Sequence, residues 1–128
     1  MNIETLHLEG SAKTPTIDFN QETGVLELRG RSIPENSTEF YKPVFEWLDA
    51  YIDAPSANTE FAFKLQYFNT SSSKCILDVL RKLEKLHING NKVVVNWFYE
   101  EDDEDMKEAG ENYQRIVSVP IQLTLLDI

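Results

Sequence analysis

The fold is decided by the stretch LQYFNTSSSKCILDVL, which covers residues 65–80. It opens with an apolar run typical of a strand, continues through a polar segment from Asn69 to Ser73, and ends in apolar residues at helical spacing. A strand that leads directly into a helix indicates an α/β protein, in which functional groups collect beyond the carboxyl ends of parallel strands. Four consecutive hydroxyl side chains, Thr70 to Ser73, lie at such an end.

The flanking sequence extends this pattern in both directions. Apolar alternation or a continuous apolar run predicts strands at residues 4–10, 14–20, 24–31, 59–68, 92–99 and 117–126. Helical spacing predicts helices at residues 71–90 and 100–117, and a further helix within residues 32–55. The order β-β-β-α-β-α-β-α-β predicts an α/β fold with a mixed β-sheet. Its first strands should be antiparallel, and right-handed crossovers should make the later ones parallel, with helices packed on the sheet.

Three details of this prediction concern single elements. Proline in a helix interior removes a hydrogen bond, so Pro43 favours a helix that begins near Lys42, with residues 34–41 as a structured turn, over a helix that begins earlier and kinks. The continuous apolar run at residues 92–99 predicts a central strand covered on both faces. Alternation within residues 59–68 predicts one inner face made of Phe61, Phe63, Leu65 and Tyr67.

Composition limits the classes of function. The 128 residues fit a single domain over 1–128, and the net charge of −10 disfavours binding to nucleic acid or to an anionic membrane. A protein partner with a basic face is easier to reconcile with that charge. The lone Cys75 allows no internal disulfide, and no apolar signal or membrane-length segment occurs. We therefore expect a cytoplasmic protein.

The hydroxyl cluster has two explanations. Asn69, Thr70 or Ser71 could cap the helix, because short polar side chains accept hydrogen bonds from its first N–H groups. Alternatively, one hydroxyl accepts a phosphoryl group, whose charge the helix dipole and those N–H groups would stabilise. Lys74, one turn further on, could assist.

Two other segments contain polar residues that are candidates for a site. The acidic run Glu100 to Asp105 lacks the spaced oxygen ligands of a calcium loop, and acidic residues are favoured at a helix start, so we expect neither metal nor cofactor. In the segment SIPENS, residues 32–37, Glu35 and Asn36 are typical of a turn and a helix cap. No G-x-S-x-G, P-loop or H-E-x-x-H motif occurs, so we do not expect an enzyme. A receiver domain would need an acidic phosphoacceptor at the strand end, where this sequence has Asn69 and Thr70.

Several segments together resemble a known family. The turn that begins at Asn69 is similar to the Asp-Ser-Ser-Gly turn of STAS-domain anti-sigma factor antagonists, in which the first serine accepts a phosphoryl group. The closer resemblance is to the SiaC family of bacterial regulatory phosphoproteins. It rests on GRSIPENSTEFYKPVFEWL, LQYFNTSSSK and VVVNWFYEEDDEDM, at residues 30–48, 65–74 and 93–106, and on the overall length.

The resemblance implies a STAS-like fold and a phosphorylation-controlled protein-binding switch. Thr70 would be the phosphothreonine, and Asn69, Ser71 and Ser72 would shape its turn, with Glu35 and Asn36 near the partner-binding surface. The implied partners are a cognate serine/threonine kinase, a PP2C-type phosphatase and a diguanylate cyclase, which connects the protein to cyclic-di-GMP and biofilm regulation. A small-molecule-binding or catalytic domain that uses the same strand-end site, and an unmodified structural adaptor, remain alternatives.

Overall fold

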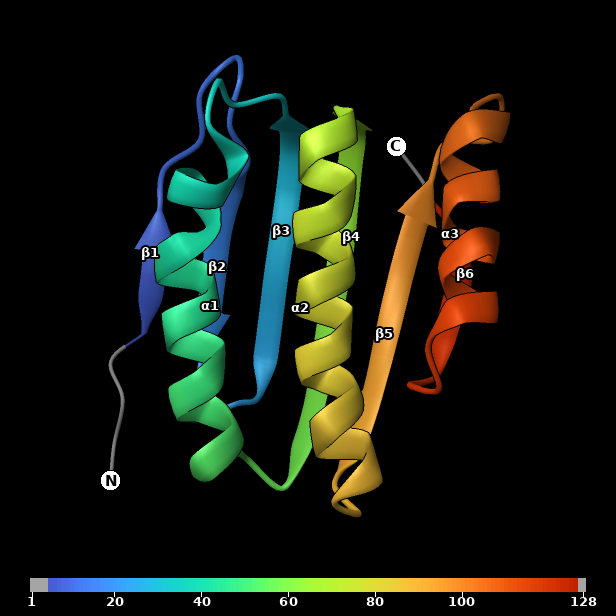
Figure 1. The fold of residues 1–128 in the computed structure, drawn as a ribbon. Helices are drawn as coiled ribbons and strands as arrows, with labels where there is room; N and C mark the ends of the chain where they lie inside the picture. The colour runs from blue at the N-terminus through green and yellow to red at the C-terminus, as the bar shows by residue number, and fades with distance from the viewer. Residues whose placement is uncertain (1–4, 127–128) are drawn as a thin grey trace.

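Six strands form one sheet whose spatial order is the same as their order in the chain (Figure 1). The computed structural model describes residues 5–126. The elements are β1 Leu6–Leu8, β2 Thr16–Asn20, β3 Val25–Ser32, α1 Ser37–Asp53, β4 Asn58–Phe68, α2 Thr70–Ile88, β5 Lys92–Tyr99, α3 Glu104–Ile116 and β6 Ile121–Leu125. The predicted order of strands and helices is confirmed, as is the mixed sheet. The STAS-like likeness stays a prediction.

The pairing of the strands places all three helices on one face of the sheet. β1, β2 and β3 pair antiparallel, whereas β3, β4, β5 and β6 pair parallel in chain order. Successive right-handed crossovers in one direction put their helices on the same side, and Figure 1 shows α1 and α2 in front of the sheet. The prediction that residues 92–99 are covered on both faces was therefore wrong.

The opposite face of the sheet is polar over much of its area, which is why it can stay uncovered. Ion pairs run across it from strand to strand. The Asp18 carboxylate accepts from Arg29 (2.6 Å), and Lys64 lies 2.9 Å from the Glu27 carboxylate. Lys64 also lies over the ring of Phe98 at 5.1 Å from its centroid, and so partly shields that apolar side chain of β5.

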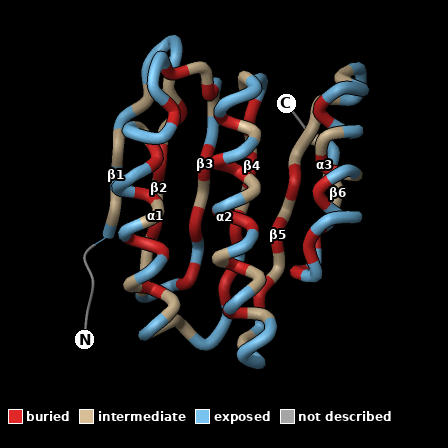
Figure 2. The backbone as a smooth tube through the Cα atoms, viewed as in Figure 1, coloured by how far each residue is buried: buried red, intermediate tan, exposed pale blue. Residues whose placement is uncertain are grey.

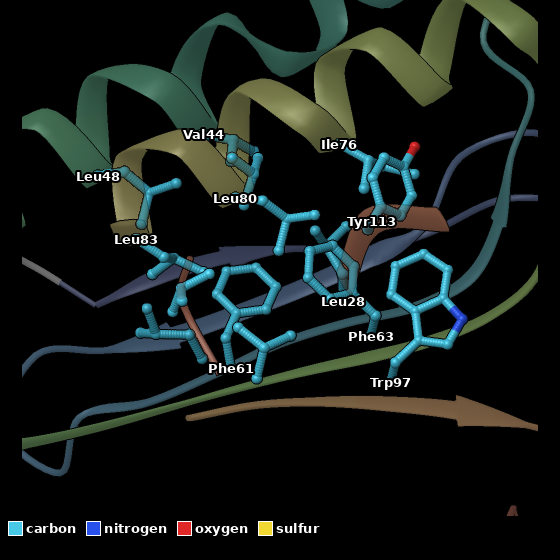
Figure 3. Packing of buried hydrophobic residues seen from close by; sticks show 14 of the residues in the cluster. Leu28, Val44, Leu48, Phe61, Phe63, Ile76, Leu80, Leu83, Trp97 and Tyr113 are labelled. Carbon is cyan, nitrogen blue, oxygen red and sulfur yellow. The ribbon is translucent and has the colours of Figure 1, made fainter. Parts of the chain in front are cut away.

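The core lies between the helices and the inner face of the sheet (Figures 2 and 3). The helical spacing that predicts α2 is that of its buried apolar stripe, which includes Ile76, Val79, Leu80, Leu83 and Leu86. Below it, the rings of Phe61 and Phe63 pack along β4 with centroids 4.5 Å apart, and the rings of Phe63 and Trp97, with centroids 5.1 Å apart, join β4 to β5. No helix among residues 5–126 is both long and apolar enough to span a bilayer.

A β-bulge near the end of β4 changes the side-chain alternation of that strand. Gly30 of β3 lies opposite Leu65, but the next residue, Arg31, lies opposite Tyr67, so Gln66 is the extra residue. Side chains beyond a bulge switch faces, and Tyr67 is accordingly 54% exposed while Leu65 is buried. The prediction that Tyr67 belongs to the inner face was wrong for this reason.

Helix α1 begins earlier than its proline indicated. Ser37 is its first residue, so residues 37–41 are helical and the predicted start near Lys42 was wrong. The carbonyl that Pro43 leaves without an intrahelical donor belongs to Glu39, and both residues are exposed to water. Because water can satisfy that carbonyl, the helix tolerates proline on its outer side.

Gly110 provides a test of the packing between α3 and the sheet. A Cβ atom at this position would lie 2.6 Å from Cδ1 of Trp97 and 2.6 Å from Cδ2 of Leu123. Although alanine favours a helix over glycine by about 1 kcal/mol, overpacking costs about 1–3 kcal/mol. We therefore expect Gly110→Ala to lower the free energy of unfolding in urea denaturation. The exposed Lys107→Ala in the same helix should change it by less than about 0.5 kcal/mol, and a Gly110→Ala protein more stable than the native one would contradict the packing argument.

Candidate functional site

The start of α2 is capped by an amide and not by a hydroxyl. The Oδ1 atom of Asn69 accepts the Ser72 N–H at 2.9 Å, and the Asn69 carbonyl accepts the Ser73 N–H at 3.0 Å. Asn69 has the extended backbone expected of an N-cap residue. Of the three capping candidates in the sequence, the structure selects Asn69, so capping does not account for the hydroxyls that follow it.

Thr70 is the first residue of α2 and lies exposed at its N-terminal end. Within residues 5–126 its hydroxyl makes no hydrogen bond. The first N–H groups of a helix, here those of Thr70 and Ser71, have no intrahelical acceptor, and the helix dipole is positive at this end. Lys74, one turn further on, is also exposed. These surroundings would stabilise an added negative charge on the Thr70 hydroxyl.

The next two serines connect α2 to its neighbours. The Ser71 hydroxyl lies 2.7 Å from the Ser37 hydroxyl at the start of α1 and donates to Asn69 Oδ1 at 3.2 Å. Ser72 is fully buried, and its hydroxyl donates to the Ser32 carbonyl at 3.0 Å and accepts from the Ser32 hydroxyl at 2.9 Å. Ser71 and Ser72 therefore join the starts of two helices to the end of β3.

Tyr41 of α1 extends these contacts into the core. Its hydroxyl lies 2.6 Å from the Ser32 hydroxyl. Burial raises the pKa of Tyr41 to about 12. Tyr41 is thus protonated at neutral pH, and because the single hydrogen of Ser32 is donated to Ser72, Tyr41 must donate to Ser32. The Ser37 hydroxyl lies 3.3 Å from that of Ser72, so a row of hydroxyls leads from Tyr41 in the core to Ser71, the residue after Thr70.

The segment at residues 32–37 lies directly beside this turn. The Asn69 N–H donates to the Ser32 carbonyl at 3.0 Å, and the Asn69 side-chain amide donates to the Pro34 carbonyl at 3.4 Å. Asn36 is the N-cap of α1, as predicted for this segment, and accepts the Glu39 N–H at 3.1 Å. Glu35 is exposed on the same loop. The structure thus brings the two segments together, and a role for Glu35 and Asn36 in partner binding stays a prediction.

The acidic run lies at the start of α3, also at the carboxyl edge of the sheet. Asp103 is the N-cap and accepts the Met106 N–H at 3.0 Å, while Glu104 and Asp105 occupy the first turn. Among residues 5–126 no three His, Cys, Asp or Glu side chains are arranged to hold a metal ion. Later in α3, the Tyr113 hydroxyl donates to the Ser73 carbonyl at 2.8 Å and so holds α3 against the first turn of α2.

Three residues of the site were not identified from the sequence as part of it. Ser32 and Ser37 lie in the segment that is typical of a turn and a helix cap, and Tyr41 lies within residues 32–55, where only a helix is predicted. All three form hydrogen bonds around the Thr70 turn, across separations of up to 40 residues. One pattern could have indicated the two serines: one stands at the end of a parallel strand, and the other stands at the start of the helix that follows it.

The hollows of the surface differ between the two ends of the sheet. A hollow of about 450 Å³ lies at the amino ends of β4 and β5, where residues 58–60 and 91–94 line it, away from Thr70. The hollow at the carboxyl edge, lined by Gln66 to Phe68 and by residues of the α3 start, holds only about 150 Å³. Since small-molecule pockets measure roughly 300–1,000 Å³, the strand-end site fits a small-molecule ligand poorly.

The sequence matches a protein family that has been described. Residues 8–126 match the family model described as SiaC family regulatory phosphoprotein. An uncharacterized protein of Pseudomonas aeruginosa strain UCBPP-PA14 is 33% identical over 122 residues, which are 95% of this chain and 97% of that protein.

Two crystal structures have the same fold. The structure of apo-SiaC from Pseudomonas aeruginosa matches with a TM-score of 0.87 and 32% identity, over 95% of this chain and 99% of that one. The structure of the diguanylate cyclase SiaD in complex with its activator SiaC, from the same organism, matches with a TM-score of 0.89 and 32% identity, over 94% of this chain and 99% of the matched chain.

The capping geometry predicts unequal effects of two neighbouring substitutions. Asn69→Ala removes the cap of α2, so we expect the free energy of unfolding to fall by about 1 kcal/mol, within a range of about 0.5–2. Thr70→Ala removes an exposed hydroxyl without a hydrogen bond and should change it by less than about 0.5 kcal/mol. Urea denaturation of both variants beside the native protein measures the difference, and an equal loss for the two would contradict Asn69 as the capping residue.

Proposed function

Because the chain belongs to the SiaC family of regulatory phosphoproteins, we propose that it is a protein-binding switch controlled by phosphorylation of Thr70. The family consists of regulators and not of enzymes. One observation carries the assignment to Thr70: it is the exposed first residue of α2, and its hydroxyl is free of hydrogen bonds within residues 5–126. Ser72, by contrast, is buried, and Ser71 is hydrogen-bonded to Ser37 and Asn69.

The free hydroxyl matters because a kinase must reach the acceptor oxygen and remove its proton. Ser73 is the other nearby candidate. Its hydroxyl donates a hydrogen bond to the Thr70 carbonyl at 2.6 Å, and this hydrogen bond would have to be broken before phosphorylation. Phosphorylation of Thr70 adds about −1.5 to −2 charges at pH 7. The N-terminal end of α2 stabilises that charge, so the modification changes the surface without unfolding the helix.

The unphosphorylated form is the one proposed to bind its target. The related SiaC protein activates the diguanylate cyclase SiaD, and we propose a diguanylate cyclase as the target here too. A partner surface that packs on an uncharged Thr70 would have to desolvate the phosphoryl group, so phosphorylation should weaken the complex. A serine/threonine kinase and a PP2C-type phosphatase are proposed to set the two forms.

The test has a chemical and a binding readout. The protein is incubated with candidate kinases from its own genome and ATP, and the modified residue is mapped by mass spectrometry. Binding of diguanylate cyclases from the same genome is then measured by isothermal titration calorimetry with both forms. We expect modification at Thr70 and at least tenfold weaker binding after it, which corresponds to about 1.4 kcal/mol.

Matched variants separate Thr70 from its neighbours. Thr70→Ala should bind the cyclase like the unmodified protein and should not be phosphorylated, whereas Ser71→Ala should still be phosphorylated at Thr70. Thr70→Asp carries one negative charge and should weaken binding less than phosphorylation does. The proposal would be contradicted by modification confined to Ser71, Ser72 or Ser73. It would also be contradicted by equal affinity of the two forms for the cyclase.

A further inference from the structure

Two neighbouring strands separate at the carboxyl edge of the sheet. The pairing of β4 with β5 ends at Phe63 and Trp97, although β4 continues beside β3 as far as Phe68 and β5 continues beside β6 as far as Tyr99. The 150 Å³ hollow lies at the end of β4 that has lost this partner, and the start of α3 forms its other side. Figure 1 shows α3 at the edge of the sheet, on the far side of β5 from α2, although the Tyr113 hydroxyl of α3 reaches the Ser73 carbonyl of α2. The last residues of β4 are thus open toward α3.

The hollow has an apolar floor and an exposed aromatic side chain. Met106, Ala109 and Phe68 are buried or half-buried apolar residues that line it. Tyr67 lines it as well and is 54% exposed, because the bulge at Gln66 turns its side chain away from the core. An apolar surface with an exposed tyrosine is suited to the stem of a long side chain and to a cation above the ring.

The wall of the hollow is acidic and its charge is not compensated. Asp103 and Asp105 line it, and none of its seven lining residues is basic. Asp105 makes no hydrogen bond or ion pair with any residue from 5 to 126. Although the positive end of the α3 dipole opposes a cation there, six consecutive acidic residues from Glu100 to Asp105 outweigh its roughly half charge.

We propose that this hollow, lined by Gln66 to Phe68, Asp103, Asp105, Met106 and Ala109, receives an arginine side chain of a partner protein. The alkyl stem would pack on Met106 and Ala109, and the guanidinium group would lie over Tyr67 and pair with Asp105. Arginine fits better than lysine, because its planar guanidinium group both stacks on an aromatic ring and donates two hydrogen bonds to one carboxylate. The size of the hollow suits one side chain and not a drug-sized molecule.

The position of the hollow connects it to the switch. Tyr67 and Phe68 immediately precede Asn69 and Thr70, so one partner surface can cover both features. In this respect the inference rests on the proposed function, in that the partner is the target protein of the switch. The recognition of arginine itself needs no phosphorylation, which allows the two to be tested separately.

The experiment uses the full chain, isotopically labelled, in an NMR titration with the peptide acetyl-Gly-Arg-Gly-amide. We expect millimolar binding, with the largest amide shifts at Tyr67, Phe68, Met106 and Ala109. The same peptide with citrulline, which has nearly the same shape without the charge, should cause no such shifts. Equal shifts with citrulline, or shifts spread evenly over the acidic surface, would overturn the proposal.

Three variants test the individual contacts. Asp105→Lys should weaken binding of the arginine peptide at least tenfold, and Tyr67→Ala should weaken it severalfold. If the peptide were held only by diffuse charge attraction, Tyr67→Ala would bind it with unchanged affinity. Asp53→Lys is the matched control, because Asp53 is an exposed aspartate at the other end of the molecule, where α1 ends. It should bind the peptide like the native protein, and a loss equal to that of Asp105→Lys would refute a specific site.

The same variants are then measured against the diguanylate cyclase of the preceding section, or against another protein partner if the cyclase does not bind. Asp105→Lys should weaken that complex at least tenfold in the unphosphorylated state, while Asp53→Lys should not. Unchanged partner affinity would reject the role of the hollow in the complex even if the peptide binds. Loss of partner binding in Asp105→Lys without any effect of phosphorylation would reject the switch and leave the arginine site standing.

Discussion

The site depends on the hydrogen bonds that fix the end of β3 to the start of α2. The Ser32 carbonyl accepts both the Asn69 N–H and the buried hydroxyl of Ser72. These two donors come from the two sides of the strand-to-helix turn, so they hold its backbone in one place. An unpaired buried carbonyl or hydroxyl costs about 1–3 kcal/mol. The loss of any one of these hydrogen-bonding groups would therefore destabilise the protein by leaving its buried partner unpaired. The exposed position of Thr70 follows from this buried pairing.

The same arrangement explains why the serines are so close together. Parallel strands β3 and β4 end at one edge of the sheet, and the helices that follow them begin there. Two helix starts side by side contain many N–H groups without intrahelical acceptors. Asn36 and Asn69 satisfy some of them as caps, and Ser37 and Ser71 bond to each other between the helices. The polar cluster therefore provides hydrogen-bond partners where two helix ends lie close together. Thr70 is the residue of this cluster whose hydroxyl takes no part in these hydrogen bonds.

Much of the fold could be predicted from the sequence because burial on one side gives a clear period. The stripe of α2 and the inner residues Phe61, Phe63 and Leu65 of β4 follow directly from it. Local chemistry was also readable where both partners lie within one turn, as for Asn36 and Glu39. Gly90 stands at the end of the helix predicted over residues 71–90 and has a φ of 94°, with the Asn91 N–H hydrogen-bonded to the Leu86 carbonyl as in a Schellman motif.

The errors in prediction came from features whose cause lies elsewhere in the chain. The predicted helix start near Lys42 was wrong because the exposure of Pro43 on the outer side of α1, which makes proline tolerable there, is a property of the folded protein. The continuous apolar run in β5 predicted that both faces of the strand are covered by helices. On the outer face, Phe98 is shielded by Lys64 of the neighbouring strand and not by a helix. The row from Tyr41 through Ser32 to Ser72 joins residues up to 40 positions apart, and no local pattern indicates such a contact.

The bulge at Gln66 has a consequence for how this segment can vary. Residues before it and residues after it face the core in opposite phase, because the strand gains one residue against β3. The chain length between Leu65 and Asn69 therefore decides which hydroxyl stands on the surface and which is buried. Removing one residue there would restore regular alternation and could exchange the roles of Thr70 and its neighbours without altering any of them. In this segment, spacing carries as much information as residue identity.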